Sequence, residues 1–254
     1  MARKKGKTWL PVVVTFVAIA FVAAAFFYVR NLNFITGAKT KFKDFGIYIP
    51  QQYSIHGIDV SRYQRGISWD MVSIMEDEGV KIGFAFLKAT EGISIYDPRH
   101  YYNYKNAKLH GLTCGAYHYF KPNIDGKLQA DFFYNNVNLE AGDLPPVLDV
   151  EETGSVSNKV FIARVGEWLK VTEKNFGVKP IIYTNAHMYN KYFLGKFDDY
   201  PLWIAHYQTN TPAVMRKWDF WQHSETGRVN GINAKVDFNV FSGDSSEFRN
   251  LLIK

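Results

Sequence analysis

The segment PPVLDVE, residues 145–151, decides the fold that the sequence predicts. Its short apolar run is typical of a parallel strand that is buried on both faces. The run ends in two carboxylates, Asp149 and Glu151, and a third, Glu152, follows directly. In α/β barrels the side chains at the C-terminal ends of the strands form the functional site. The segment therefore predicts a barrel strand that ends at a functional rim.

Seven other segments are equally short, apolar and rich in β-branched or aromatic residues, namely 56–61, 81–90, 113–120, 179–185, 201–207, 218–224 and 234–243. Capping residues, glycine stops and apolar periodicity predict helices after the first five strands, over 68–79, 97–111, 125–140, 157–177 and 187–195. Turn-rich loops follow the sixth and seventh strands, and a last helix is predicted over 245–254. The sequence thus predicts an α/β fold, a modified TIM-like barrel of five βα units followed by three strands.

The N-terminus predicts a membrane anchor. Residues 10–29 carry no charge and follow a basic cluster, Arg3, Lys4, Lys5 and Lys7. About 20 apolar residues suffice for a transmembrane helix, and the basic end is expected to stay in the cytoplasm. The predicted divisions are an anchor over 1–30, a linker over 31–54 and a barrel domain over 55–254. The barrel would then lie on the periplasmic or extracellular side. The alternative is a signal peptide cleaved near residues 23–25, which would leave a secreted protein.

Charge and cysteine content exclude several classes of function. The net charge is +6, of which residues 1–30 contribute five positive charges, so the remainder is close to neutral. A nucleic-acid-binding face is therefore not expected. Cys114 is the single cysteine and is predicted to be buried and inert. No histidine spacing typical of metal sites and no phosphate-binding loop is present. We expect no metal, no cofactor and a monomer.

Four carboxylates are the predicted catalytic residues, Asp59, Asp149, Glu151 and Asp237. Asp149 and Glu151 are two positions apart, so both point to the same side of the strand, with Cβ atoms about 6.6 Å apart. Asp59 and Asp237 belong to the first and last strands, which are neighbours if the barrel closes. Crowded carboxylates raise the pKa of at least one member and keep it protonated near neutral pH. Glycoside hydrolysis uses such an acid together with a second carboxylate.

The aromatic content is larger than a core requires, with 6 Trp, 16 Tyr and 20 Phe. Some of these rings are expected to stack on sugar rings. The predicted substrate-binding residues at the strand ends are Tyr117, His118, Tyr119, Tyr183, Trp203, Tyr207 and Gln222. For His118 a hydrogen-bonded structural role is the alternative to a sugar contact. His206 and His223 are interpreted as structural, and Lys88 and Glu91 either as a salt bridge that shapes the rim or as functional groups.

Eight motifs carry a resemblance to a known family. They are GIDVSRYQRGISW, FAFLKATEG, GAYHYF, PVLDVEE, IIYTN, LWIAHY, FWQHS and KVDFNVFSG, in this order over residues 57–243. They resemble the motifs of the family-25 glycoside hydrolases, the Chalaropsis-type lysozymes. The resemblance implies N-acetylmuramidase activity on the β-1,4 bond between N-acetylmuramic acid and N-acetylglucosamine in peptidoglycan.

The resemblance also implies roles for single residues. Glu151 matches the proton donor and Asp149 its partner, which orients the substrate's own N-acetyl group, while Asp59 and Asp237 match the acids of the first and last strands. Two alternatives stay open at this point. One is a barrel that binds peptidoglycan without cleaving it, and the other is a glycosidase that acts on a different amino-sugar polymer such as chitin.

Overall fold

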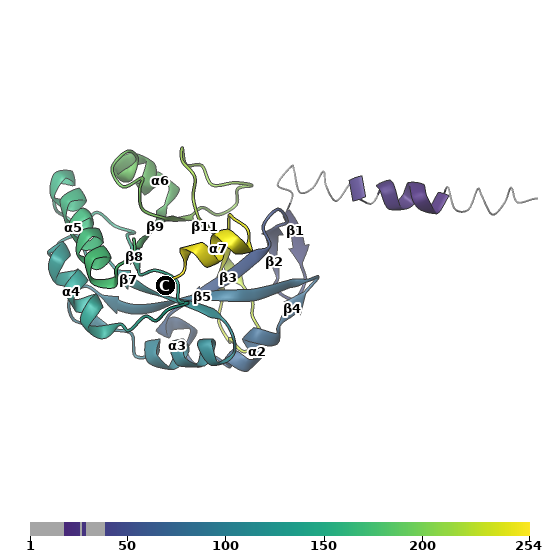
Figure 1. Ribbon diagram of the computed structural model, residues 1–254, viewed down its shortest axis with the longest axis horizontal. Coiled ribbons are helices and arrows are strands. Elements are labelled where there is room, and N and C mark those ends of the chain that lie inside the picture. Colours follow the sequence, from purple (N-terminus) through teal and green to yellow (C-terminus); the bar gives the residue numbers. More distant parts are fainter. Residues whose placement is uncertain (1–17, 26, 29–38) are drawn as a thin grey trace, which may run out of the picture.

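Eight strands close into a barrel in the computed structural model of the protein, which describes residues 18–25, 27–28 and 39–254 (Figure 1). The barrel strands are β3 (Ile55–Val60), β5 (Val80–Glu91), β7 (Thr113–Tyr119), β8 (Val147–Asp149), β9 (Ile181–Asn185), β10 (Leu202–Ala205), β11 (Phe220–Gly227) and β12 (Val236–Phe241). They pair in the order β3-β12-β11-β10-β9-β8-β7-β5, and β5 pairs with β3 to close the ring. Two short strands, β4 (Glu76–Asp77) and β6 (Ile95–Tyr96), pair with β5.

A helical segment follows each of the first five barrel strands. These segments are α2 (Trp69–Ile74), α3 (His100–Leu109), α4 (Gly126–Asn136), α5 (Asn158–Phe176) and α6 (Ala186–Met188), the last continuing into a π-helical turn, η2 (Tyr189–Phe193). The predicted five βα units followed by three strands are confirmed. Figure 1 shows α3, α4 and α5 along the outside of the barrel. Helix α2 is shorter than predicted, because the backbone becomes extended at Met75 and Glu76–Asp77 form β4. Positive φ angles of 48° at Glu78 and 85° at Gly79 then turn the chain into β5.

Side chains alternate along the strands between the barrel interior and the outer layer. On β5, Phe84 and Phe86 belong to the interior cluster, whereas Ala85 and Leu87 pack against the outer elements. The interior cluster contains Phe84, Phe86, Leu144, Val147, Ile181, Tyr183, Trp203, Ala205, Phe220, Phe241 and Phe248. This packed interior supports the strand ends from below, so polar side chains at the rim stand on a rigid base.

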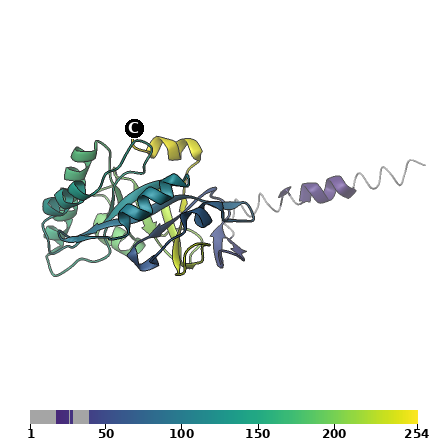
Figure 2. The same cartoon turned by 90° about the horizontal axis from the view of Figure 1, so that it is seen from below.

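Helix α7 (Ser245–Leu251) covers the N-terminal end of the barrel. Its Phe248 ring lies 5.2 Å from the ring of Phe241 and 5.7 Å from that of Phe84, measured between centroids. The carboxylate of Asp244 accepts hydrogen bonds from the first turn of the helix and so caps it. Figure 2 shows α7, in yellow, at one edge of the barrel. The predicted last helix is confirmed and ends three residues before the C-terminus.

Strand β12 runs antiparallel to both of its neighbours, β11 and β3. The first residues of β12 therefore lie at the same end of the barrel as the last residues of the parallel strands. Asp237, the second residue of β12, pairs with Asp59 near the end of β3. The predicted closure between the first and last strands is confirmed, but Asp237 reaches the rim from the beginning of its strand.

A hairpin of β1 (Lys39–Phe42) and β2 (Ile47–Pro50) corrects the predicted linker over residues 31–54. From Lys39 onward this segment is part of the folded domain. Phe45 is fully buried, and its ring centroid lies 5.1 Å from that of Phe238 on β12. Four-residue strands are too short to show a clear alternation of apolar and polar residues, which is why the sequence did not indicate them.

Half of the predicted membrane-spanning segment, residues 10–29, lies outside the described residues, namely 10–17, 26 and 29. Within that segment, residues 18–25 are helical. Across the part of the chain that the structure describes, no helix combines the length and the apolar character that crossing a membrane requires.

Replacement of Phe45 by Ala is expected to lower the free energy of unfolding by about 3–5 kcal/mol, as for other large-to-small core changes. The cause is the cavity left between the hairpin and β12. Urea unfolding of the full-length protein in mild detergent measures the loss. Tyr48→Ala, in the same hairpin but 56% exposed, should change stability much less. Equal stabilities of Phe45→Ala and the unmodified protein would show that the hairpin is not part of the cooperative unit.

Candidate active site

A cavity of about 310 Å³ opens at the C-terminal end of the barrel. All four predicted catalytic carboxylates line it, Asp59 from β3, Asp149 at the end of β8, Glu151 just beyond, and Asp237 from β12. Six of the predicted substrate-binding residues also line it, namely Tyr117, Tyr119, Tyr183, Trp203, Tyr207 and Gln222. The structure therefore brings together nearly all of the residues singled out from the sequence.

Asp59, which is buried, and Asp237, which is half-buried, form an acid pair. They are cross-strand partners in the β3–β12 register and share a hydrogen bond between their side chains. Burial raises the pKa of both carboxyls, and the charge of Asp59 raises the pKa of Asp237 further. Two amide groups, Asn239 Nδ2 and Gln222 Nε2, each donate to Asp59 Oδ2 at 2.8 Å and favour its ionised form. Asp237 therefore carries the proton that the pair shares.

Gln222 connects the acid pair to two tyrosines. Its Oε1 accepts hydrogen bonds from Tyr183 Oη at 2.8 Å and from Tyr207 Oη at 2.6 Å. With both lone pairs of Oε1 engaged, the amide can only direct its nitrogen towards Asp59. The predicted rim residue Gln222 thus fixes the orientation of three neighbours, and it is itself buried.

Asp149 and Glu151 occupy the same face of the chain at different depths. Asp149 is 5% exposed, and its Oδ1 has no hydrogen-bond partner in the described part of the chain. Burial raises its pKa well above the ordinary value, and the charge of Glu151 adds to the effect. Glu151 is exposed at the mouth of the cavity. Partial desolvation of its carboxyl nevertheless raises its pKa, while the charge of Lys88 acts in the opposite direction.

The aromatic residues of the cavity fall into two groups. Trp203 is 2% exposed and stacks on Phe86 at 4.3 Å between centroids, and its Nε1 donates to Asn239 Oδ1 at 2.8 Å. It therefore forms the floor of the cavity and orients an amide that binds Asp59. Tyr117, Tyr119 and Tyr207 are partly exposed, so a bound sugar can reach them.

His118 is the predicted substrate-binding residue that the structure places elsewhere. It lies between Tyr117 and Tyr119 on β7, so alternation along the strand turns it away from the cavity. Its Nδ1 lies 2.7 Å from Thr90 Oγ1, its Nε2 lies 3.2 Å from Gln129 Oε1, and the residue is fully buried. Burial lowers the pKa of His118 to about 4. The substrate-binding prediction for His118 is wrong and its structural alternative is correct.

Several cavity residues were not indicated by the sequence. Tyr63 is 70% exposed and belongs to a single 3₁₀ turn, η1 (Arg62–Gln64), which Ser61 caps at the end of β3. Glu225 lines the cavity from β11. The capping-box pattern of Ser61 and Gln64 was a readable signal for the turn. The predicted ion pair of Lys88 and Glu91 is confirmed, with Nζ 2.7 Å from Oε2.

A second cavity of about 630 Å³ adjoins the first, because both are lined by Glu151, Tyr183 and Tyr207. His206 lies on its wall, and its Nδ1 accepts a hydrogen bond from Ala213 N at 3.0 Å. Glu151 therefore stands between two hollows and faces both. Within the described residues, no group of three or more His, Cys, Asp or Glu side chains could hold a metal ion.

Comparison with known proteins agrees with this site. The model of the family described as Glycosyl hydrolases family 25 matches residues 58–232. Lysozyme M1 of Streptomyces globisporus is 34% identical over 208 residues, which cover 76% of this chain and 69% of that protein. The crystal structure of the bacterial lysozyme from Streptomyces coelicolor aligns with a TM-score of 0.71 at 33% identity, covering 78% of this chain and 97% of that one. Uncharacterized protein YegX of Escherichia coli K12 is 48% identical over 208 residues, covering 82% of this chain and 76% of that protein.

The family match covers more than half of the chain. The chain belongs to glycosyl hydrolase family 25. It is accordingly a glycoside hydrolase of the lysozyme type.

Replacement of Asp237 by Asn is expected to make stability less dependent on pH. The pKa of Asp237 is raised in the folded protein. As pH rises above the ordinary aspartate pKa of about 3.9, the unfolded chain releases this proton before the folded protein does, so the fold loses stability. Asp237→Asn removes that titration. The variant should therefore be more stable than the unmodified protein at about pH 8, and the advantage should shrink towards about pH 4.

Urea unfolding of the full-length protein in mild detergent, at both pH values, measures this difference. Asp131→Asn serves as the control, because Asp131 lies on the surface of α4 in an ion pair with Lys127. A parallel pH dependence in Asp237→Asn and the unmodified protein would contradict the shared proton.

Proposed function

We propose that this protein hydrolyses the β-1,4 bond between N-acetylmuramic acid and N-acetylglucosamine in peptidoglycan, with Glu151 as the proton donor. The observation that carries the proposal is the position of Glu151 between two adjoining cavities, with Asp149 beside it on the same face. Family membership and the similarity to proteins named lysozyme support the substrate. A polymer needs room on both sides of the bond that is cut, and the two cavities offer it.

Glu151 has the properties of a general acid. Its pKa is raised by desolvation, which favours the protonated form that a general acid needs. Its exposed position lets the carboxyl reach a glycosidic oxygen and exchange protons with solvent. The oxygen of the departing sugar is a poor leaving group without a proton. Protonation by Glu151 therefore assists bond cleavage directly.

Asp149 is suited to interact with the positive charge that develops on the sugar during cleavage. Its Oδ1 lacks a protein partner in the described part of the chain, so that oxygen is available to a substrate. In the proposed mechanism the Asp149 carboxyl orients the substrate's N-acetyl group or stabilises the oxocarbenium-like charge at the anomeric carbon. The Asp59–Asp237 pair binds the sugar from the other side of the cavity. Its shared proton allows one of the two carboxyls to donate a hydrogen bond to the sugar.

The location of the protein is part of the proposal. The uncharged segment 10–29 and the preceding basic cluster support a membrane anchor with the cytoplasm on the basic side. The barrel then acts as a monomer on the periplasmic or extracellular side, where peptidoglycan is found. Cleavage of the same segment as a signal peptide would instead release the barrel.

Glu151→Gln should reduce turnover of purified peptidoglycan by at least about 10²-fold, the usual size of an acid–base contribution. Gln keeps the shape and hydrogen bonds of Glu, so binding to peptidoglycan should survive. Mass spectrometry of the new reducing ends identifies the bond and separates a muramidase from a glycosidase of other amino-sugar polymers. Glu140→Gln, an exposed acid paired with Lys108, is the control. Near-normal turnover in Glu151→Gln would remove Glu151 from the mechanism.

Asp149→Asn should fail differently from Glu151→Gln. The charge of Glu151 raises the pKa of Asp149, and the coupling of two neighbouring acids is reciprocal. Replacing Asp149 by a neutral residue removes this coupling, so the pKa of Glu151 should fall. The basic limb of the pH–rate profile should then move to lower pH, in addition to a loss of turnover. Initial rates on one peptidoglycan preparation across the pH range measure this. An unmoved basic limb would show that the two acids do not interact.

A protease added to spheroplasts of cells that express the protein should digest the barrel, because the barrel is proposed to lie outside the cytoplasmic membrane. An antibody against the C-terminal helix follows the digestion. A cytoplasmic marker enzyme has to stay intact in the same sample. Protection of the barrel in intact spheroplasts, with digestion after lysis, would refute the proposed orientation.

A further inference from the structure

Strand β5 contains a one-residue irregularity at the rim of the barrel. Lys88 pairs with Tyr117 on β7, but the next pair is Thr90 with His118, so Ala89 is an extra residue. This is a β-bulge, a feature that re-aims side chains and occurs often beside active sites. Ala89 and Thr90 are both fully buried in the outer layer, on the side of His118 and α4. The bulge therefore reverses the alternation of β5 in its last residues.

The consequence is that Lys88 and Glu91 share the cavity face. In a regular strand, residues three apart point to opposite faces. With the bulge, Lys88 and Glu91 lie opposite Tyr117 and Tyr119, which both line the cavity. Lys88 Nζ binds Glu91 Oε2 at 2.7 Å, and both side chains are mostly buried, with 12% and 17% exposed. The ion pair depends on the bulge.

Lys88 is the counter-charge of the cavity. Among the residues that line it, all within the described part of the chain, Lys88 is the single lysine, arginine or histidine. Five carboxylates line the same cavity, namely Asp59, Asp149, Glu151, Glu225 and Asp237. Opposite charge favours the ionised form of a carboxyl, and the effect is strong where water is scarce. The placement of this one ammonium group therefore bears on Asp149 and Glu151, whose pKa values its charge lowers.

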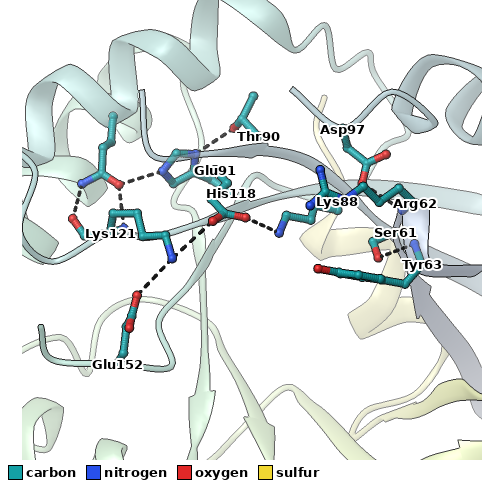
Figure 3. Close-up of polar contacts among 11 residues, drawn as sticks. Ser61, Arg62, Tyr63, Lys88, Thr90, Glu91, Asp97, His118, Lys121 and Glu152 are labelled. Carbon is teal, nitrogen blue, oxygen red and sulfur yellow. Dashed lines mark hydrogen bonds and ion pairs between the residues drawn. The ribbon is translucent and has the colours of Figure 1, made fainter. Parts of the chain in front are cut away.

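A second lysine completes the support for Lys88, as Figure 3 shows. Lys121 Nζ binds Glu91 Oε1 at 3.2 Å and Glu152 Oε1 at 3.2 Å. The ring of Tyr119 lies between the two lysines, with Lys88 Nζ 4.7 Å and Lys121 Nζ 4.5 Å from its centroid. Glu91 thus uses one oxygen for each lysine. It can therefore hold Lys88 in place while Lys121 balances part of the charge of Glu91, and the Lys88 ammonium is the member of this network that lines the cavity.

We infer that the bulge at Ala89 is a positioning device, by which Glu91 and Lys121 hold the Lys88 ammonium against the acids of the cavity and so set their ionisation. The effect on ionisation does not depend on the proposed function, and only its consequence for catalysis rests on that function. Lys88 acts on Asp149 and Glu151, where its charge opposes the rise in pKa that burial causes. Glu91 and Lys121 act through Lys88 and through the charge of this network. The other charged or titratable groups that line the cavity are Asp59, Tyr63, Tyr117, Tyr119, Tyr183, Tyr207, Glu225 and Asp237.

The direct test is the titration of Glu151 itself. Carboxyl-¹³C NMR of the full-length protein in mild detergent follows each acid, and the Glu151 signal is assigned by its loss in Glu151→Gln. In Lys88→Met the titrations of Glu151 and Asp149 should both move to higher pH, because a positive charge is lost. Lys88→Arg should titrate close to the unmodified protein. Lys127→Met, which removes an exposed lysine on α4, should leave both titrations unchanged.

A second variant, Lys121→Met, provides the same test if Lys88→Met does not fold. Lys121 is 36% exposed, and its charge also lowers the pKa of Glu151. Lys121→Met should therefore move the Glu151 titration in the same direction. In kinetics on peptidoglycan, the basic limb of the pH–rate profile should follow these shifts. Glu91→Gln should lower kcat in the unmodified protein but have little further effect in Lys88→Met, because Glu91 acts through Lys88.

The outcomes separate the two proposals. Unchanged titrations in both lysine variants, or additive effects of Glu91→Gln and Lys88→Met, would overturn the inference even in a fully active enzyme. Shifted titrations in a protein that does not cleave peptidoglycan would overturn the proposed function and leave the positioning device standing.

Discussion

The antiparallel pairing of β12 with β3 is the constraint on which the site depends. It sets Asp237 opposite Asp59 in the register of the closing strands, and two adjacent carboxyls that are buried or half-buried cannot both be ionised at low cost. One shared proton and two amide donors, Gln222 and Asn239, stabilise the pair. Tyr183, Tyr207 and Trp203 in turn hold those amides. Most of the polar upper layer of the barrel is therefore organised around a single acid pair.

The apolar layer below makes this arrangement rigid. Interdigitated aromatic side chains fill the barrel under the polar layer, and α7 covers the opposite end. Residues on strands that stand on such a core keep their geometry better than residues on loops. The two acids proposed for catalysis depart from this rule in part. Asp149 ends a strand, whereas Glu151 lies just beyond it and is exposed, so the proposed proton donor has a freedom of movement that the deeper acids lack.

The sequence was sufficient to predict the parallel strands and the acids at their ends, because buried runs that stop at charged residues leave a clear pattern. The direction of β12 was not predictable, since an apolar strand looks the same in either direction. His118 was misplaced because the alternation along YHY can be assigned to either face until a neighbour fixes it. Tyr63 and Glu225 were missed because loop and hairpin residues carry no periodic signal. The fold was thus more predictable than the parts of the cavity that loop and hairpin residues form.

The extra residue Ala89 has a consequence for how this chain can change over evolutionary time. Deleting it would restore a regular strand, turn Thr90 towards the cavity and send Glu91 into the packed layer under α4. A substitution near this position alters one side chain. The deletion of a single codon would instead move every following side chain of the strand to the other face. Insertions and deletions should therefore be tolerated in the loop after Glu91. Within FLKATE they should be removed by selection, because the number of residues there matters as much as their identity.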